Sequence, residues 1–207
     1  MASHRSPALW LATGSPRRRD LLEQAGFPIA GRIAPGDPVD ETLRPDESAS
    51  AAAERLARAK LAAALAAPGR PTDAVLLAAD TLVVGADGVP LGKPRDAREA
   101  ERMLAGLSGR WHAVTTAVAV GDGLRCRQVT VTSWLKMITL DPAVIRAYVA
   151  TGEPLDKAGG YGLQGRAGAL IERIEGDCSA VIGLPLADTS RLLAAFGVRP
   201  AWLTTHA

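Results

Sequence analysis

Three consecutive arginines close to the amino terminus could bind an anion, in the segment Thr13-Gly14-Ser15-Pro16-Arg17-Arg18-Arg19. Serine is a favoured N-cap and proline is favoured at the first helical position, so a helix is predicted to begin at Ser15-Pro16. Cations in a first helical turn oppose the helix dipole unless an anion binds there. The segment therefore predicts a phosphate site in which Ser15, Arg17 and Arg18 hold phosphate oxygens. A solvated basic helix face is the alternative interpretation.

A carboxylate lies inside the most apolar stretch of the chain. Residues 74–84 form a nearly continuous apolar run, which predicts a strand buried on both faces, with Asp80 in its middle. A lone buried carboxylate is strongly destabilising unless it is paired, hydrogen-bonded or bound to a metal. This position favours Asp80 as a general base that takes a proton from water. The alternative is a structural aspartate that caps a turn within the run.

Other charged side chains could complete such a site. Glu41 stands in a loop, and its carboxylate, with Asp80 acting through water, could hold Mg²⁺, which prefers oxygen ligands. Lys60 lies at the edge of the apolar stripe of a predicted helix, and Lys93 lies on the corner Gly92-Lys93-Pro94. Both could add positive charge against a phosphate. A surface turn acid is the alternative for Glu41, and a lysine extended into solvent is the alternative for Lys60.

A glycine-rich segment over residues 152–165 could form a further part of a ligand site. It contains five glycines together with Lys157 and Gln164. Glycine allows the backbone to approach a ligand closely, so this loop predicts a ligand-binding role for the two polar side chains. His112, by contrast, stands alone at the start of a predicted strand and is interpreted as structural or exposed rather than catalytic.

In combination and in order, these motifs closely resemble the Maf family of nucleoside triphosphate pyrophosphatases over residues 9–197. The motifs that carry the resemblance are Ala12-Thr13-Gly14-Ser15-Pro16-Arg17-Arg18, Val39-Asp40-Glu41, Ala79-Asp80-Thr81, Leu91-Gly92-Lys93-Pro94, Asp156-Lys157-Ala158-Gly159-Gly160-Tyr161-Gly162-Leu163-Gln164-Gly165 and Gly183-Leu184-Pro185-Leu186. The resemblance implies an α/β fold like that of the inosine triphosphate pyrophosphatases, with a long mixed β-sheet flanked by helices. It also implies one domain over residues 1–207, with a core at about 9–197, in which two lobes that are not independent domains flank a central cleft.

The same resemblance implies an activity and a cofactor. The reaction is hydrolysis of a nucleoside triphosphate to the monophosphate and pyrophosphate, with a divalent metal cation such as Mg²⁺, Mn²⁺ or Co²⁺. Asp80 matches the proton acceptor of the family, and Arg17, Thr81 and Gln164 match its specificity positions. The branch that acts on 7-methyl-GTP carries Trp, Gln and Glu at those three positions, so this chain resembles the dTTP/UTP branch. A homodimer is a family expectation.

The sequence departs from the family pattern at three places. Thr13 replaces the more usual serine and keeps a hydroxyl, and Ala117 stands where a glycine is frequent. Gly176-Asp177-Cys178 replaces a frequent Gly-Ser-Tyr, which removes an aromatic side chain near the cleft. The last of these changes affects the expected base pocket and, with it, the expected range of substrates.

Helices and strands alternate along the chain to position these residues. Helices are predicted over residues 16–26, 48–67, 96–107 and 141–152, and a final helix follows Leu184-Pro185 as far as about residue 197. Strands are predicted over residues 9–12, 29–33, 74–84, 111–120, 129–138 and 169–174. Residues from Val198 onward are predicted to form a tail.

Composition limits the classes of function. With 207 residues, of which 47% are hydrophobic and 22% charged, the chain can bury a substantial core. A net charge of +2 and few aromatic residues argue against a nucleic-acid partner. The sequence contains no apolar run of about 18 residues, which argues against a membrane partner. Two cysteines without metal-ligand spacing predict reduced thiols and a cytoplasmic location.

Two other functions remain open at this point. One is a nucleotide-binding regulator of septum formation and cell division whose role does not depend on catalysis. The other is a 7-methyl-GTP pyrophosphatase. Release of pyrophosphate from a panel of nucleoside triphosphates separates both from the dTTP/UTP reaction. A protein that only binds nucleotides releases none, and a 7-methyl-GTP pyrophosphatase releases it from a different nucleotide.

Overall fold

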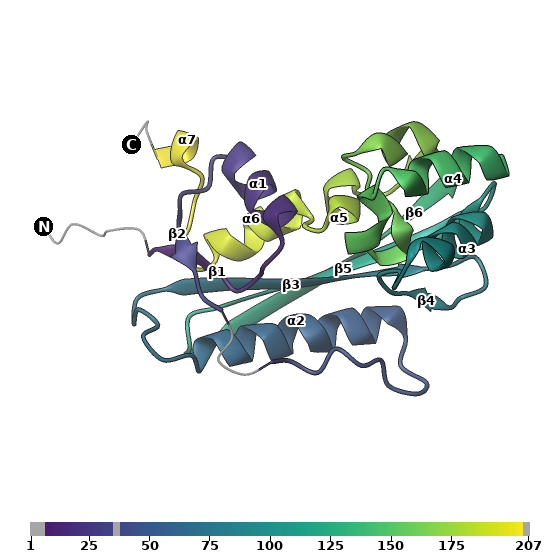
Figure 1. Ribbon diagram of the computed structural model, residues 1–207. Helices are drawn as coiled ribbons and strands as arrows, with labels where there is room; N and C mark the ends of the chain where they lie inside the picture. Colours follow the sequence, from purple (N-terminus) through teal and green to yellow (C-terminus); the bar gives the residue numbers. More distant parts are fainter. Residues whose placement is uncertain (1–6, 35–37, 205–207) are drawn as a thin grey trace, which may run out of the picture. The chain divides into compact units, whose positions relative to one another are not determined.

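The computed structural model describes residues 7–34 and 38–204 (Figure 1). The strands are β1 (Leu9–Leu11), β2 (Ile29–Arg32), β3 (Val75–Val84), β4 (Pro90–Leu91), β5 (Trp111–Gly121), β6 (Cys126–Met137) and β7 (Ile171–Glu175). The α-helices are α1 (Pro16–Gln24), α2 (Ala49–Leu65), α3 (Ala97–Leu107), α4 (Pro142–Ala150), α5 (Cys178–Ile182), α6 (Leu186–Ala194) and α7 (Ala201–Thr204). The short 3-10 helices are η1 (Glu153–Asp156), η2 (Ala158–Gly160) and η3 (Arg166–Leu170).

A mixed β-sheet organises the fold. Across the described residues seven strands form this sheet in the order β2-β1-β3-β5-β6-β7, and β4 pairs with β3 outside that order. β1 runs parallel to β2 and β3, whereas β4 is antiparallel to β3 and β7 is antiparallel to β6. The first six residues of β3 are all buried, which explains why its sequence is continuously apolar rather than alternating. The predicted α/β class, with a long mixed sheet and flanking helices, is confirmed.

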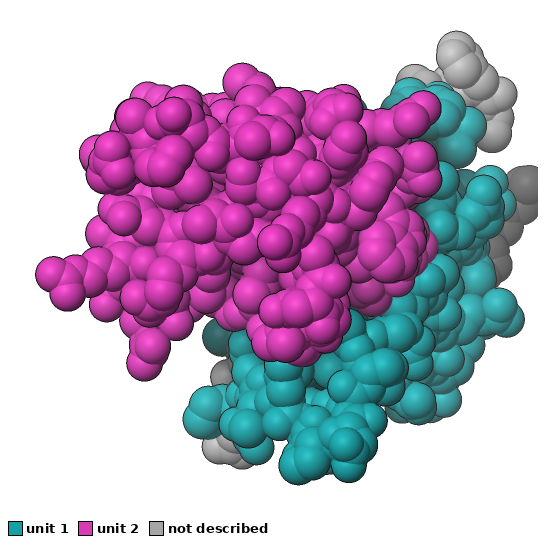
Figure 2. Space-filling view, turned by 90° about the vertical axis from the view of Figure 1, so that its right-hand side faces the viewer, with its two compact units in different colours: residues 1–80, 117–130, 183–207 teal, residues 81–116, 131–182 magenta. Residues whose placement is uncertain are grey.

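The chain divides into two compact units (Figure 2). Unit 1 comprises residues 1–80, 117–130 and 183–207, and unit 2 comprises residues 81–116 and 131–182. The division passes through β3, β5 and β6, each of which contributes residues to both units. The boundary in β3 lies between Asp80 and Thr81. The single domain of two lobes predicted from the sequence stays a prediction.

In unit 1, α2 lies on one face of the strands and α1 and α6 lie on the other (Figure 1). The buried face of α2 alternates small and large apolar side chains, which lets the helix pack closely on the sheet. These residues are Ala52, Ala53, Leu56, Ala57, Leu61 and Ala64. Ser48 caps the helix, because its hydroxyl accepts a hydrogen bond from the Ala51 N–H at 3.2 Å.

Unit 2 has an apolar core of its own. Its buried members come from α3, α4, the ends of β3, β5 and β6, and the glycine-rich segment, and they include Val83, Leu104, Leu135, Ile145 and Tyr161. Asp96 caps α3, since its carboxylate accepts a hydrogen bond from the Glu99 N–H at 2.8 Å. The predicted helix start at residue 96 is therefore confirmed.

The prediction of a tail beyond Val198 is wrong. Val198 is only 2% exposed, and α7 follows it. The Trp202 indole N–H donates to the carbonyl of Ala25 at 3.0 Å, and the Ala201 N–H donates to the carbonyl of Gly26 at 2.8 Å. The start of α7 therefore packs on the carboxyl end of α1, a contact between distant parts of the sequence that local patterns do not encode.

Within residues 7–34 and 38–204, no helix combines the length and the apolar character that crossing a membrane requires.

Gly26 should be sensitive to substitution because of this contact. Its φ is +81°, and a Cβ added there would lie 2.7 Å from Trp202 Cδ1. We expect Gly26→Ala to lower the free energy of unfolding by about 2 kcal/mol or more, from backbone strain together with displacement of the indole. Gly69→Ala is the matched control, because its φ is +76° and nothing lies within 4 Å. Urea unfolding compares the two variants. Equal losses in the free energy of unfolding would show that contact with Trp202 does not add to the cost of a side chain at Gly26.

Candidate functional site

The ammonium of Lys60 lies between two carboxylates in unit 1. Its Nζ is 2.6 Å from Asp80 Oδ1 and 2.6 Å from Glu41 Oε1. The three side chains come from α2, from β3 and from the loop that precedes α2. Asp80 is 7% exposed, whereas the Glu41 side chain is 63% exposed. The structure therefore brings three of the predicted site residues together around one cationic atom.

This ion pair resolves two of the expectations from the sequence. Asp80 is buried in an apolar strand, and the expectation that such a carboxylate needs a partner is confirmed by Lys60. The Lys60 side chain is only 18% exposed, so the alternative of a lysine extended into solvent is wrong. The lysine lies one turn after the buried Leu56, at the edge of the buried face of α2.

Arg18 anchors the start of α1. It is buried, its Nε donates to the carbonyl of Gly183 at 2.9 Å, and its Nη1 donates to Thr13 Oγ1 at 2.9 Å. The Thr13 hydroxyl also accepts a bond from the Ser15 N–H at 3.3 Å. The departure from serine to threonine at position 13 thus keeps an acceptor that the structure uses. Ser15 is the N-cap of α1 as predicted, with an extended backbone but no hydrogen bond from its side chain to the helix.

The charge of Arg18, at the start of α1, interacts with the carboxylates of Asp80 and Glu41. Burial lowers the pKa of Arg18 to about 10. The negative charge of Asp80 acts in the opposite direction, the charge of Arg17 adds to the lowering, and the charge of Glu41 opposes it. The guanidinium therefore lies in the field of both carboxylates. Arg19 differs from its neighbours, because it points to solvent and pairs with Glu23 at 2.7 Å.

Thr81 belongs to a chain of hydroxyls in unit 2. Its Oγ1 is 2.8 Å from Thr116 Oγ1, and the Thr116 hydroxyl donates to the carbonyl of Ala180 at 2.7 Å. Because Thr116 gives its one proton to Ala180, Thr81 is the donor in the first contact. The Thr81 hydroxyl is thus oriented by α5, a helix that the sequence analysis did not predict.

Asp177 explains both α5 and one departure from the family pattern. Its Oδ1 accepts hydrogen bonds from the Ser179 N–H at 2.7 Å, the Ser179 hydroxyl at 2.6 Å and the Ala180 N–H at 3.1 Å. Its own N–H donates to Ser133 Oγ at 2.9 Å. Aspartate is a favoured N-cap residue, so this signal for the start of α5 was available in the sequence. The residue that replaces the family's serine is therefore the cap of α5.

The remaining predicted residues lie on the loops of unit 2. Lys93 is exposed and lines a cavity of about 490 Å³ between β4 and α3. The carbonyl of Gly92 accepts a hydrogen bond from the Gly159 N–H at 3.0 Å, so the corner that carries Lys93 is tied to the glycine-rich segment. Lys157 Nζ donates to the carbonyl of Glu153 at 2.7 Å and to Asp156 Oδ1 at 2.5 Å. Gln164 is exposed on a turn.

The predicted site residues therefore divide between the units. Arg18, Glu41, Lys60 and Asp80 form a charged cluster within unit 1, which also contains Ser15 and Arg17. Unit 2 contains Thr81, Lys93, Lys157 and Gln164. Sequence reasoning missed Thr116, Glu153 and Asp177. For Glu153 the only available signal was its place within the glycine-rich segment.

The carboxylates of unit 1 are suitable ligands for a divalent cation. Glu41 Oε1 and Asp80 Oδ1 already converge on one cationic atom, and Mg²⁺ is bound by one or two carboxylates together with water and phosphate oxygens. Among the residues that the structure describes, no group of three or more His, Cys, Asp or Glu side chains could hold a metal. Cys126 and Cys178 are both free thiols, so neither forms a disulfide.

Comparison with known proteins gives consistent matches over nearly the whole chain. A family model described as Maf-like protein matches residues 8–196. The chain is also similar to proteins of several bacteria that are named dTTP/UTP pyrophosphatase. In Hahella chejuensis the relative is 46% identical over 191 residues, which is 92% of this chain and 93% of the relative. In Chromobacterium violaceum it is 47% identical over 195 residues, with 91% and 94% covered. In Methylobacillus flagellatus it is 49% identical over 190 residues, with 92% and 93% covered.

His112 should make the stability of the protein depend on pH. Its Nε2 lies 2.7 Å from the Tyr161 hydroxyl, next to the turn that carries Gln164, and burial lowers the pKa of His112 to about 4. The unfolded chain takes up a proton near pH 6.5, which the folded histidine does not. The free energy of unfolding should therefore fall as the pH drops from about 6.5 to about 4, by up to about 3 kcal/mol.

Urea unfolding of the wild type and of His112→Gln at several pH values tests this expectation. The variant cannot titrate at this position, so its stability should fall less over the same interval. Parallel pH profiles for the two proteins would assign the loss of stability to other groups.

Proposed function

The chain belongs to the Maf family, and we propose that it hydrolyses dTTP and UTP, or a modified pyrimidine nucleoside triphosphate, to the monophosphate and pyrophosphate. The names of the relatives support the reaction and the bases. The single structural observation that carries the proposal is the cluster of Lys60, Asp80 and Glu41 in the field of Arg18. It combines a buried proton acceptor with the positive charge that a triphosphate requires.

In this proposal the start of α1 binds phosphate. Arg17, Arg18 and the N–H groups of the first turn supply positive charge, and Ser15 shapes the turn as its N-cap. The anchoring of Arg18 to Thr13 and Gly183 keeps that turn in place before substrate arrives. Lys93 adds a point charge against the phosphates, and Lys157 contributes from the glycine-rich segment.

Asp80 acts as the general base. It accepts the proton of the water that attacks the α-phosphorus, and Lys60 holds its carboxylate by the 2.6 Å ion pair. Burial in β3 keeps the carboxylate in one orientation, because neighbouring side chains are closely packed. Lys60 thereby has two roles, since its ammonium also adds to the positive charge near the phosphates.

We further propose that Glu41, with Asp80 acting through water, holds a divalent cation such as Mg²⁺, Mn²⁺ or Co²⁺. When bound, such a cation neutralises charge on the triphosphate and orients its oxygens. The convergence of the two carboxylates on one cationic atom supports this assignment.

Thr81 and Gln164 are proposed to select the base. The Gln164 amide offers one donor group and one acceptor, which match the O4 or O2 and the N3–H of thymine and uracil. The Thr81 hydroxyl has its orientation set by Thr116. A protein that only binds nucleotides, such as a regulator of cell division, would release no pyrophosphate in the assays below.

Replacement of Asp80 should remove most of the turnover. We expect Asp80→Asn to lower kcat for dTTP about 10²–10⁴-fold, because a general base contributes about that factor. Asp73→Asn is the matched control, since Asp73 is exposed just before β3. Pyrophosphate release with Mg²⁺ measures both, and circular dichroism confirms that each variant is folded. A folded Asp80→Asn protein that keeps most of its rate would remove Asp80 from this role.

Replacement of Gln164 should change the order of preference among bases. A carboxylate only accepts hydrogen bonds, so Gln164→Glu should lose activity on UTP relative to GTP, whose base presents two adjacent donors. We expect a shift of about tenfold in the ratio of kcat/KM values, the equivalent of one lost hydrogen bond. Gln24→Glu, on the surface at the end of α1, is the control. An unchanged ratio in a panel of triphosphates would place Gln164 outside the base pocket.

A further inference from the structure

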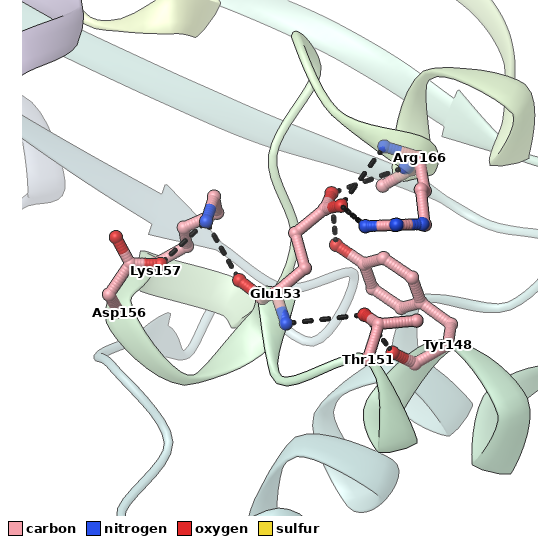
Figure 3. Close-up of polar contacts among 7 residues, drawn as sticks. Tyr148, Thr151, Glu153, Asp156, Lys157 and Arg166 are labelled. Atoms are coloured by element: carbon pink, nitrogen blue, oxygen red, sulfur yellow. Dashed lines mark hydrogen bonds and ion pairs between the residues drawn. The ribbon is translucent and has the colours of Figure 1, made fainter.

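The carboxylate of Glu153 contacts Tyr148 and Arg166 (Figure 3), and Arg166 comes two residues after Gln164 in the chain. Its Oε2 accepts a hydrogen bond from the Arg166 N–H at 3.1 Å, and its Oε1 accepts one from the Tyr148 hydroxyl at 3.0 Å. Arg166 Nη1 lies 3.4 Å from Oε2, and the Ala167 N–H points to Oε1 at 3.5 Å. One carboxylate therefore holds two successive backbone N–H groups immediately after the turn.

The backbone of the turn is pressed against this carboxylate. The turn consists of residues 162–165 and is closed by the Gly165 N–H, which donates to the carbonyl of Gly162 at 3.0 Å. A Cβ added at Gly165 would lie 2.1 Å from Glu153 Oε1. The φ of Gly165 is −103°, so space and not backbone conformation requires glycine here. Any larger residue at this position must displace the carboxylate.

Lys157 supports the other end of the same turn. A Cβ added at Gly162 would lie 2.5 Å from Lys157 Cε, so the stem of the lysine covers that glycine. The ammonium donates to the carbonyl of Glu153 and to Asp156 (Figure 3). Leu163 and Gln164, the two central residues, are thus held between a lysine stem on one side and a carboxylate on the other.

The end of α4 fixes Glu153 itself. The Thr151 hydroxyl donates to the carbonyl of Tyr148 at 2.6 Å and accepts the Glu153 N–H at 3.2 Å (Figure 3). Burial alone would raise the pKa of Glu153, but the bonds from Arg166, Tyr148 and Ala167 outweigh burial and lower it. Glu153 is therefore ionised at neutral pH and accepts from all of these donors.

We propose that Glu153 is a positioning residue that sets base selectivity, because it fixes the turn on which Gln164 is presented. This inference rests on the proposed function of Gln164 as the residue that reads the base. Glu153 does not touch the substrate in this proposal. It acts through the Arg166 and Ala167 N–H groups, so its loss leaves Gln164 present but poorly placed.

Kinetics on matched variants provide the first test. We expect Glu153→Ala to lower the ratio of kcat/KM for dTTP over dCTP about tenfold, mainly through KM for dTTP, with kcat changed less than about threefold. Glu153→Gln keeps one acceptor oxygen and should restore part of the ratio. Glu172→Gln is the control, because Glu172 is an exposed glutamate on β7 that pairs only at the surface with Lys136.

Gly165→Ala provides a second variant that leaves Glu153 in the sequence. It should lower the same ratio, because the new methyl group displaces the carboxylate, and the double variant with Glu153→Ala should lose little more than either single one. Additive losses in the double variant would overturn the proposal. So would a Glu153→Ala protein that loses thermal stability but keeps the wild-type ratio, since that result indicates a purely structural role.

Amide hydrogen exchange separates this inference from the proposed function. Exchange at Gly165, Arg166 and Ala167, whose N–H groups are hydrogen-bonded to Gly162 or to Glu153, should accelerate about tenfold or more in Glu153→Ala and remain unchanged in Glu172→Gln. If the wild type releases no pyrophosphate from any triphosphate, the proposed function fails, whereas the exchange data still report whether Glu153 holds the turn. If exchange is unchanged in Glu153→Ala, the inference fails whatever the activity.

Discussion

One ammonium group, that of Lys60, allows β3 to carry a carboxylate among buried apolar side chains. Without a compensating charge at 2.6 Å, Asp80 would be a carboxylate transferred from water into a protein interior, which is strongly destabilising. Packing of the apolar face of α2 on the sheet brings the Lys60 ammonium to Asp80. The small side chains on the buried face of α2 make that close approach sterically possible.

The same ammonium also organises the surroundings of Asp80. Glu41 reaches Lys60 from an exposed loop, and the guanidinium of Arg18 lies in the field of both carboxylates. Lys60 Nζ lies 2.6 Å from both carboxylates, and Asp80 and Arg18 are buried, so each of these charges has a large effect on its neighbours. Arg18 is held by Thr13 and Gly183, which connects the start of α1 to the segment before α6.

Unit 2 uses a different means to position side chains. Its glycine-rich segment has few side chains that could pack, and hydrogen bonds to its backbone replace them. Glu153 accepts from two backbone N–H groups, Gly92 accepts from Gly159, and His112 contacts the Tyr161 hydroxyl. Glu153 lies on η1 and His112 on β5, and both elements have buried side chains, so a segment that would be mobile in isolation takes one conformation. Hydrogen bonds also position Thr81, whose hydroxyl contacts Thr116, and Thr116 in turn donates to Ala180 in α5. Asp177 caps that helix, because it accepts a hydrogen bond from the Ala180 N–H.

The sequence by itself determined the elements whose signals are local. Ser15-Pro16 and Gly26 delimit α1, Asp96 begins α3, and the apolar run of β3 predicts a strand buried on both faces. It also determined that Asp80 needs a partner, and the motifs identified the family. Only the tertiary structure decided that Lys60 is this partner, that α5 accepts the hydrogen bond of the Thr116 hydroxyl, and that α7 packs on Gly26. The reason is physical: propensity and periodicity act over a few residues, whereas these contacts join segments 20 to 177 residues apart, and their geometry arises only when the helices pack on the sheet.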